Sequence, residues 1–455
     1  MVFILIGKGS AEARFASQFS LSAGEQYTDN VFFSEPKQYD FITVITPTLG
    51  LIYQPSSTSA SKFTADLNVP AEIFARHSAL NNIGDQLSLR SRLDYPYSRR
   101  LSFELTDCLG RLGKARNGEF GNTQGGGFGG TGSLGNFSGR GNSGGCGGSG
   151  GFGEGGLLSR GNQSSLNEAG LITTGETIEN SFDANGQFLY TPNLTFRSLY
   201  QWRYLAFIDA GGKEMSHAGA IEGRYSGWLH QNLSARFTLE YIKSRNGDTN
   251  LVPNIDIGDD FISSRKIQLT PTLTLSVSNG IGLLTQSKFP IKHNLNVSLM
   301  KLWQRATFQT DVRRGITGSY GASGPSYTTS FFSNFTILLT RRLNMFASVG
   351  YSMFDTDQGN FNTFIAGAGI RYNIFYWLSV NLAYTYRRAN PEGGSLNSTS
   401  SLQGKTDSNA VFIMFSAAFD IWPHLGLGRG QYGIQAFPAA PPGGALSPSP
   451  PMLTP

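Results

Sequence analysis

The sequence predicts an all-β protein, a transmembrane antiparallel up-and-down β-barrel of about 16 strands, with about 14 and 18 as the limits. Three observations predict it. Apolar and polar residues alternate with a period of two, the alternating stretches have the ~9–11 residues that a tilted strand needs to cross a bilayer, and turn residues separate them. The composition agrees, because charged residues make up only 15 % while the chain holds 33 Phe, 18 Tyr and 57 Gly.

The stretch from Gln86 to Tyr95 shows the alternation clearly. Successive side chains of a strand point to opposite faces, so residues of one parity share a face. One parity is apolar and the other is charged: Leu87, Leu89, Leu93 and Tyr95 alternate with Arg90, Arg92 and Asp94. The same pattern recurs in residues 194–204, 233–241, 267–277, 306–313 and 378–387.

Turn signals and aromatic clusters complete the barrel prediction. Three Asn-Gly pairs predict hairpin turns, at Asn185-Gly186, Asn246-Gly247 and Asn279-Gly280. The aromatic run Phe375–Trp377 predicts a girdle at a membrane interface. The alternative fold is a soluble β-sandwich, which also alternates. Its strands usually have only ~5–6 residues, and it does not place Arg and carboxylate pairs in strand centres.

The remaining segments differ in composition from the barrel. No apolar run reaches the ~18 residues of a transmembrane helix. Residues 1–13 are interpreted as the remnant of a signal peptide, with a disordered leader as the alternative. The barrel is predicted for residues 14–420, with a disordered Gly-rich loop at 118–156 inside it, and residues 421–455 form a Pro/Gly-rich tail predicted to be disordered.

Several stretches resemble a bacterial family of outer-membrane β-barrel porins associated with exosortase (PEP-CTERM) and exopolysaccharide loci. Tyr27–Val31 resembles the first-strand element of that family, and Asp40–Leu51 resembles its second strand. Residues 367–372 and 378–388 resemble its penultimate hairpin, and Asp407–Val411 resembles the approach to its last strand. The resemblance implies a location in the bacterial outer membrane and a role in exporting or anchoring surface polymers. It offers no catalytic residues.

The polar faces supply the candidate site residues. The pore-lining candidates are Arg90, Arg92, Asp94, Arg197, Arg203, Arg236, Glu240, Asp311, Arg313 and Arg387. Seven of these are arginines and three are acids, so a lumen that they line is expected to favour anions. The alternative is that these charges neutralise one another and fill the barrel.

Other chemistry is not indicated. The five scattered histidines form no triad or metal pattern with the acids, so we expect no enzyme activity, no metal and no cofactor. The net charge of +5 includes no long Lys/Arg run, so no nucleic-acid partner is expected. The expected partners are outer-membrane lipid and lipopolysaccharide, the outer-membrane assembly machinery and exopolysaccharide.

The sequence therefore predicts a porin-like barrel with a polar pore, serving passive solute passage or surface-polysaccharide export. The alternative is a non-conducting structural or adhesive barrel that displays the Gly-rich loop. The two cysteines, Cys108 and Cys146, are candidates for a disulfide, which an oxidising periplasm would permit, with two unpaired thiols as the alternative. The Gly-rich loop is expected to be mobile and dispensable for the barrel.

Overall fold

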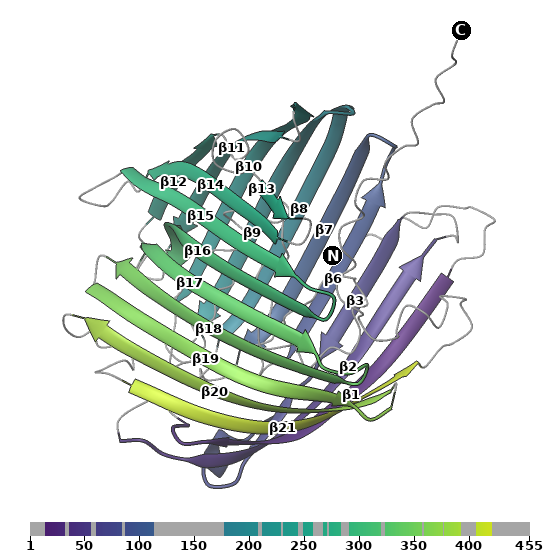
Figure 1. Cartoon of the computed structure of the whole chain (residues 1–455), viewed down its shortest axis with the longest axis vertical. Helices are drawn as coiled ribbons and strands as arrows, with labels where there is room; N and C mark the ends of the chain where they lie inside the picture. The colour runs from purple at the N-terminus through teal and green to yellow at the C-terminus, as the bar shows by residue number, and fades with distance from the viewer. Residues whose placement is uncertain are drawn as a thin grey trace. The chain divides into compact units, whose positions relative to one another are not determined.

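The computed structural model describes residues 14–31, 36–55, 61–83, 87–112, 177–207, 212–228, 231–243, 249–257, 267–270, 273–283, 291–319, 324–356, 359–375, 377–392 and 406–420. These residues belong to one compact unit. Apart from a 3-10 turn at Ser78–Leu80, the elements in them are strands of one sheet (Figure 1). Every strand pairing is antiparallel, which confirms the predicted all-β fold.

The strands are β1 (Arg14–Thr28), β2 (Asp40–Gln54), β3 (Lys62–Asn68), β4 (Ala71–Phe74), β5 (Asn82–Ile83), β6 (Ser88–Pro96), β7 (Leu101–Leu112), β8 (Thr177–Thr191), β9 (Leu194–Phe207), β10 (Lys213–Trp228), β11 (Gln231–Lys243), β12 (Thr249–Ile257), β13 (Ile267–Thr270), β14 (Leu273–Leu283), β15 (Ile291–Leu302), β16 (Ala306–Ser319), β17 (Gly324–Leu338), β18 (Leu343–Thr356), β19 (Gly359–Asn373), β20 (Leu378–Glu392) and β21 (Thr406–Asp420).

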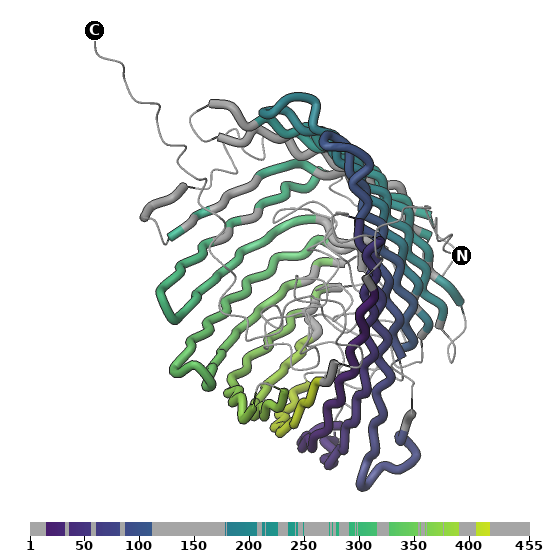
Figure 2. The backbone as a smooth tube through the Cα atoms, turned by 90° about the vertical axis from the view of Figure 1, so that its right-hand side faces the viewer, coloured from purple at the N-terminus to yellow at the C-terminus, as the bar shows by residue number. Residues whose placement is uncertain are grey.

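The pairings lead from strand to strand in chain order and return to the start, because β1 pairs with β2 on one side and with β21 on the other. Within the described residues, the 21 strands less the short β4, β5 and β13 leave 18 in this circuit, which lies at the upper limit of the predicted number. The circuit is thin between β12 and β14, where only two residue pairs join the strands, so the sheet is nearly open at that seam. In Figure 2 the purple and blue strands form one side of the sheet and the green strands the other.

The long strands have the length that a membrane requires. Strands β16 to β21 have 14 or 15 residues each. At ~3.3 Å per residue and a tilt of ~40°, such a strand rises about 35 Å, which exceeds the ~25 Å apolar band of an outer-membrane barrel. The strands can therefore span that band and extend beyond it at both ends.

The distribution of apolar and polar residues over the two faces of the sheet is the reverse of that in a soluble protein. Large apolar side chains are exposed on the outer face of nearly every strand, among them Phe41, Leu89, Phe237, Phe331 and Leu382. The buried residues on the opposite face are mainly polar or charged, and the fully buried side chains include Glu222, Asn381 and Thr238. A soluble sandwich buries its apolar residues between sheets. The burial pattern therefore excludes the sandwich alternative.

Short turns close the hairpins at one end of the sheet. At Ser98 and Thr340 the side-chain hydroxyl accepts hydrogen bonds from backbone N–H groups two and three residues later, which closes a tight turn locally. At Thr191 the hydroxyl accepts the N–H of Leu194. The connections at this end include 97–100, 192–193, 303–305 and 339–342, whereas those at the other end include 29–39, 113–176 and 393–405.

Two of the predicted hairpin turns are wrong. Asn185-Gly186 lies inside β8 and Asn279-Gly280 lies inside β14. Ladder pairing continues in register through both places, so long-range pairing outweighs the local turn propensity. The third pair, Asn246-Gly247, lies outside the described residues. The stretch 267–277, predicted as one strand, is divided into β13 and β14, which pair with each other as antiparallel strands.

Aromatic side chains gather at both ends of the outer face. At the short-turn end, Phe188, Tyr190 and Phe196 form a chain of ring contacts with centroids 6.3–6.4 Å apart. Phe375 and Trp377 stack at the same end, with centroids 5.5 Å apart, where the sequence predicts a girdle. At the other end Tyr27 contacts Tyr39 and Phe41. Two aromatic bands on an apolar exterior are typical of the two interfaces of a membrane.

Candidate functional site: the interior wall

The polar face of the sheet is the candidate site. All ten predicted pore-lining residues have the parity opposite to that of the exposed apolar residues, so the structure places each of them on this face. Arg203 and Arg236 are buried among neighbouring side chains, whereas Arg90 and Arg92 are partly exposed. Whether these residues line a water-filled pore stays a prediction.

Many of the interior charges are paired. The Nη2 atom of Arg92 lies 2.8 Å from Asp94 and 3.3 Å from Glu104. Arg224 lies 3.2 Å and Arg236 lies 3.9 Å from Glu222, which is fully buried. The ion pair Arg313–Asp311 has an N–O distance of 3.8 Å. Apart from this last pair on β16, the pairs lie on β6, β7, β10 and β11, so the wall that contains these strands carries charges of both signs.

The structure reduces the arginine excess on which the expected anion preference rests. Among the described residues, the acids that it adds to the interior face include Asp66, Glu72, Glu104, Asp183 and Glu222. The described cations that it adds to the same face include Lys62, Arg224 and Arg371. Sequence reasoning missed these residues because it counted only the most regular alternating stretches. The alternation itself could have placed these residues on the interior face. For example, Ile221 and Tyr225 are apolar and exposed at odd positions of β10, so Arg224, at an even position, faces inward.

The opposite wall is largely uncharged. Strands β1 and β17–β21 present hydroxyl and amide side chains to the interior, including Gln18, Ser22, Thr328, Thr363 and Thr385. Within this wall an apolar strip consists of Phe346, Ala383, Phe412 and Met414, with Ile365 packed against it. The interior is therefore asymmetric, because most charges lie on one side. The other side, which we call the neutral wall, is mainly uncharged and carries the cations Arg371 and Arg387.

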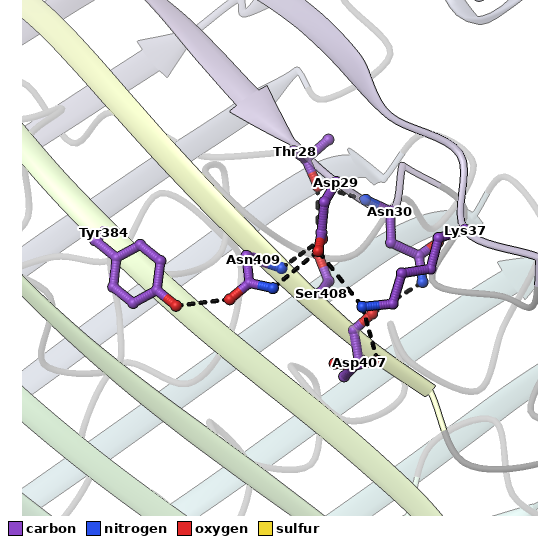
Figure 3. A network of polar contacts seen from close by, with 8 residues as sticks. All are labelled: Thr28, Asp29, Asn30, Lys37, Tyr384, Asp407, Ser408 and Asn409. Carbon is purple, nitrogen blue, oxygen red and sulfur yellow. Dashed lines mark hydrogen bonds and ion pairs between the residues drawn. The ribbon is translucent and has the colours of Figure 1, made fainter.

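At the end of the long connections, a polar network joins the first strand to the last (Figure 3). The carboxylate of Asp29 accepts hydrogen bonds from the backbone N–H of Asn409 at 2.6 Å and from its side-chain amide at 2.8 Å. The backbone N–H of Asp29 donates to the carbonyl of Asn409 at 3.0 Å. The Tyr384 hydroxyl donates to the Asn409 side chain at 2.6 Å. We call this network the rim latch.

Lys37 and Asn30 extend the rim latch. The ammonium of Lys37 lies 2.9 Å from Asp407 and 3.4 Å from Asp29. The Asn30 amide donates to the carbonyl of Asp407 at 2.9 Å. The two motifs that carry the family resemblance at opposite ends of the sequence thus meet in space. The motif near Asp29 and the motif near Asn409 therefore form one contact, which joins the first and last strands of the sheet.

The contacts of the rim latch shift the pKa values of its charged groups. Partial burial favours the neutral form of Asp29, but the hydrogen bonds from Asn409 and the charge of Lys37 outweigh it, so the pKa of Asp29 is lowered. The hydrogen bond to Asp407 raises the pKa of Lys37. Both groups are therefore charged at neutral pH.

Cys108 lies on the interior face of β7 and is 4 % exposed. The only other cysteine, Cys146, lies outside the described residues, as does the whole Gly-rich segment 118–156. The pairing of these two cysteines and the mobility of the loop therefore stay predictions. In the described part of the chain no group of His, Cys, Asp and Glu side chains could hold a metal ion, and no helix is long and apolar enough to cross a membrane.

The fold and the site define an antiparallel β-barrel with an apolar exterior and a polar interior. No family model matches the chain, and no curated protein matches it. It is similar in fold to OccK7 (OpdD) of Pseudomonas aeruginosa, with 10 % identity, 90 % of this chain and 99 % of that chain covered, and a TM-score of 0.43. It is also similar to OccAB4 of Acinetobacter baumannii, with 9 % identity, 89 % of this chain and 98 % of that chain covered, and a TM-score of 0.41.

A third similar structure is OmpT, an outer membrane protein of Vibrio cholerae, with 10 % identity, 90 % of this chain and 99 % of that chain covered, and a TM-score of 0.35. At these identities and TM-scores the likeness concerns general architecture.

Proposed function

We propose that the chain forms a polar pore through the bacterial outer membrane and lets small solutes pass. The observation that carries the proposal is the reversed burial of the sheet, with large apolar residues on the outside and charged or polar residues on the inside. In lipid every backbone polar group needs a partner, and a β-sheet meets this need only when its edges join. The pairing of β1 with β21 joins the first strand to the last, and two residue pairs join β12 to β14.

The connection lengths give the pore an orientation within this proposal. Outer-membrane barrels have short turns on the periplasmic side and longer loops outside the cell. The short connections 97–100, 192–193 and 339–342 then face the periplasm. The rim latch and the Gly-rich segment then belong to the extracellular end.

The proposed setting and partners of the pore are inferred from the sequence. The resemblance of Tyr27–Val31 and Asp407–Val411 to exosortase-associated barrels supports surface-polysaccharide export as the setting of the pore. Lipopolysaccharide and the outer-membrane assembly machinery are the corresponding partners. The proposed activity is non-enzymatic.

Conductance in a planar bilayer tests the pore. Protein refolded in detergent and added to the bilayer should produce discrete current steps, because a polar interior admits water and ions. The same preparation unfolded by heat serves as the control. Folded protein that inserts but passes no current would contradict the pore and favour the non-conducting structural or adhesive barrel.

Ion selectivity is a second test. Replacing Arg90, Arg92 and Arg203 together with Gln should move the reversal potential in a salt gradient toward that of a cation-selective pore. The reason is electrostatic: loss of Arg92 leaves Asp94 and Glu104 without their shared cation. Arg388→Gln, at an outward-facing position of β20, is the matched control and should leave the potential unchanged. An unchanged potential in the triple variant would mean that these charges do not face the ion path.

A further inference from the structure

The neutral wall contains polar atoms that have lost contact with water and have found no partner. Asn344 on β18, Arg371 on β19 and Asn381 on β20 stand directly side by side in the ladder. Their outward-facing neighbours Met345, Ile370 and Leu382 are exposed apolar residues. The three polar side chains therefore point into the barrel, and we call them the Asn–Arg–Asn row.

The unpartnered atoms include both donors and acceptors. Those in the row are Asn344 Oδ1, Arg371 Nε, and both Oδ1 and Nδ2 of Asn381. The hydroxyls of Ser379 and Ser348 nearby are also without hydrogen bonds. Both amide atoms of Asn381 lack partners, so the result does not depend on which way that amide is turned. Buried polar groups are nearly always hydrogen-bonded, and such a cluster requires an explanation.

The next row along the same strands is apolar. Phe346, Gly369, Ala383 and Phe412 follow one another across β18 to β21 in register. A side chain at Gly369 would overlap Phe346 and Ala383, so glycine at this position lets the phenyl ring lie close to the wall. The Asn–Arg–Asn row thus borders a flat apolar strip.

We propose that the Asn–Arg–Asn row and the strip beside it form a binding subsite for a neutral polyhydroxylated solute, that is, a sugar. The subsite deepens the proposed pore function and depends on it for its biological role. Each hydroxyl group both donates and accepts, so vicinal hydroxyls can satisfy the mixed set of atoms in the row. A carboxylate offers only acceptors and would leave Asn344 Oδ1 and Asn381 Oδ1 without donors.

The residues of the row differ in burial, and this difference determines which of them a solute contacts first. Asn344 and Arg371 keep part of their surface open, whereas Asn381 and Ser379 are each 1 % exposed. A solute in the interior therefore meets Asn344 and Arg371 first, and contact with Asn381 requires the side chains that cover it to move. The C–H face of a sugar ring can then lie toward the strip of Phe346 and Phe412.

Calorimetry with the folded full-length protein in detergent tests the subsite. Maltose is the probe, and butyrate, which carries a carboxylate and no hydroxyl, is the comparison. Maltose should give a saturable heat and butyrate none. Asn381→Leu should weaken maltose binding by about tenfold or more, because it removes two of the hydrogen-bonding atoms.

A matched control and a stability measurement keep the test decisive. Asn185→Leu makes the same change at another interior position, on β8, where Asn185 Oδ1 also lacks a partner, and it should leave maltose binding unchanged. Asn381→Leu should melt at or above the temperature of the parent protein, because no hydrogen bond is lost. Absence of maltose heat, or equal binding by the parent and Asn381→Leu, would overturn the subsite. Calorimetry needs no ion flow, so a protein that binds maltose without conducting would refute the pore alone.

Discussion

Replacing Phe331 with arginine is expected to prevent stable insertion of the barrel into a bilayer. Phe331 lies in the middle of β17 and is 40 % exposed on the outer face, opposite Tyr351 of β18. Arginine on the lipid-facing side near the bilayer centre costs about 2–4 kcal/mol. The variant should give a much smaller fraction of heat-modifiable, compactly migrating protein on a gel after refolding into lipid vesicles.

The control for this variant is Ser352→Arg. Ser352 lies on the inner face of β18, beside Tyr351, and is paired with Ser330. An arginine there meets the polar interior, so insertion should remain close to that of the parent. If the protein were soluble, Phe331→Arg would instead be neutral or would improve solubility. Equal insertion of Phe331→Arg and the parent would therefore refute the membrane location.

Removing the carboxylate of the rim latch should produce the second large effect. Asp29→Ala abolishes two hydrogen bonds from Asn409 and the ion pair with Lys37. Charge-assisted hydrogen bonds contribute about 1.5–3 kcal/mol each when they are buried, and the Asp29 side chain is 25 % exposed. We expect a loss of about 2–4 kcal/mol in unfolding free energy. Denaturant unfolding in detergent, followed by tryptophan fluorescence, measures it.

Tyr384→Phe is the matched variant, because it removes only the outermost hydrogen bond of the rim latch, and its effect should be small. The loss caused by Asp29→Ala should also depend on pH. A carboxyl group with a lowered pKa stabilises the fold above its unfolded pKa of about 3.9 and loses that contribution as the pH falls through the folded value. The difference between parent and Asp29→Ala should therefore persist from pH 8 to about 5 and shrink below about 4. A difference that stays constant in acid would show that the Asp29 charge is not involved.

The sequence was sufficient to predict the fold because lipid and water impose a strict two-residue period on every strand. Leu89 and Arg90 differ by one position and face opposite media, so parity alone places them. Hairpin positions were harder to predict. Asn185-Gly186 has the local chemistry of a turn, but it lies in a strand whose length is set by the membrane and whose register is set by β7 and β9.

The candidate site was predictable only in part. The charged wall follows from parity, and the ten predicted residues all lie on the interior face. The pairing of Glu222 with two arginines, and the asymmetry between the charged and neutral walls, depend on which strands are neighbours. Asn344, Arg371 and Asn381 are separate polar residues in the sequence. Only the register of three strands brings them together.

The rim latch also has a kinetic consequence. The residues that it joins are 380 positions apart, so the contact cannot form until nearly the whole chain is present and ordered. Bringing such distant segments together carries the entropic cost of closing a very long loop, which makes the latch one of the last contacts to form. Interactions that form after the transition state chiefly govern how fast the native state opens. The latch therefore lengthens the lifetime of the finished barrel and leaves its rate of assembly nearly unchanged.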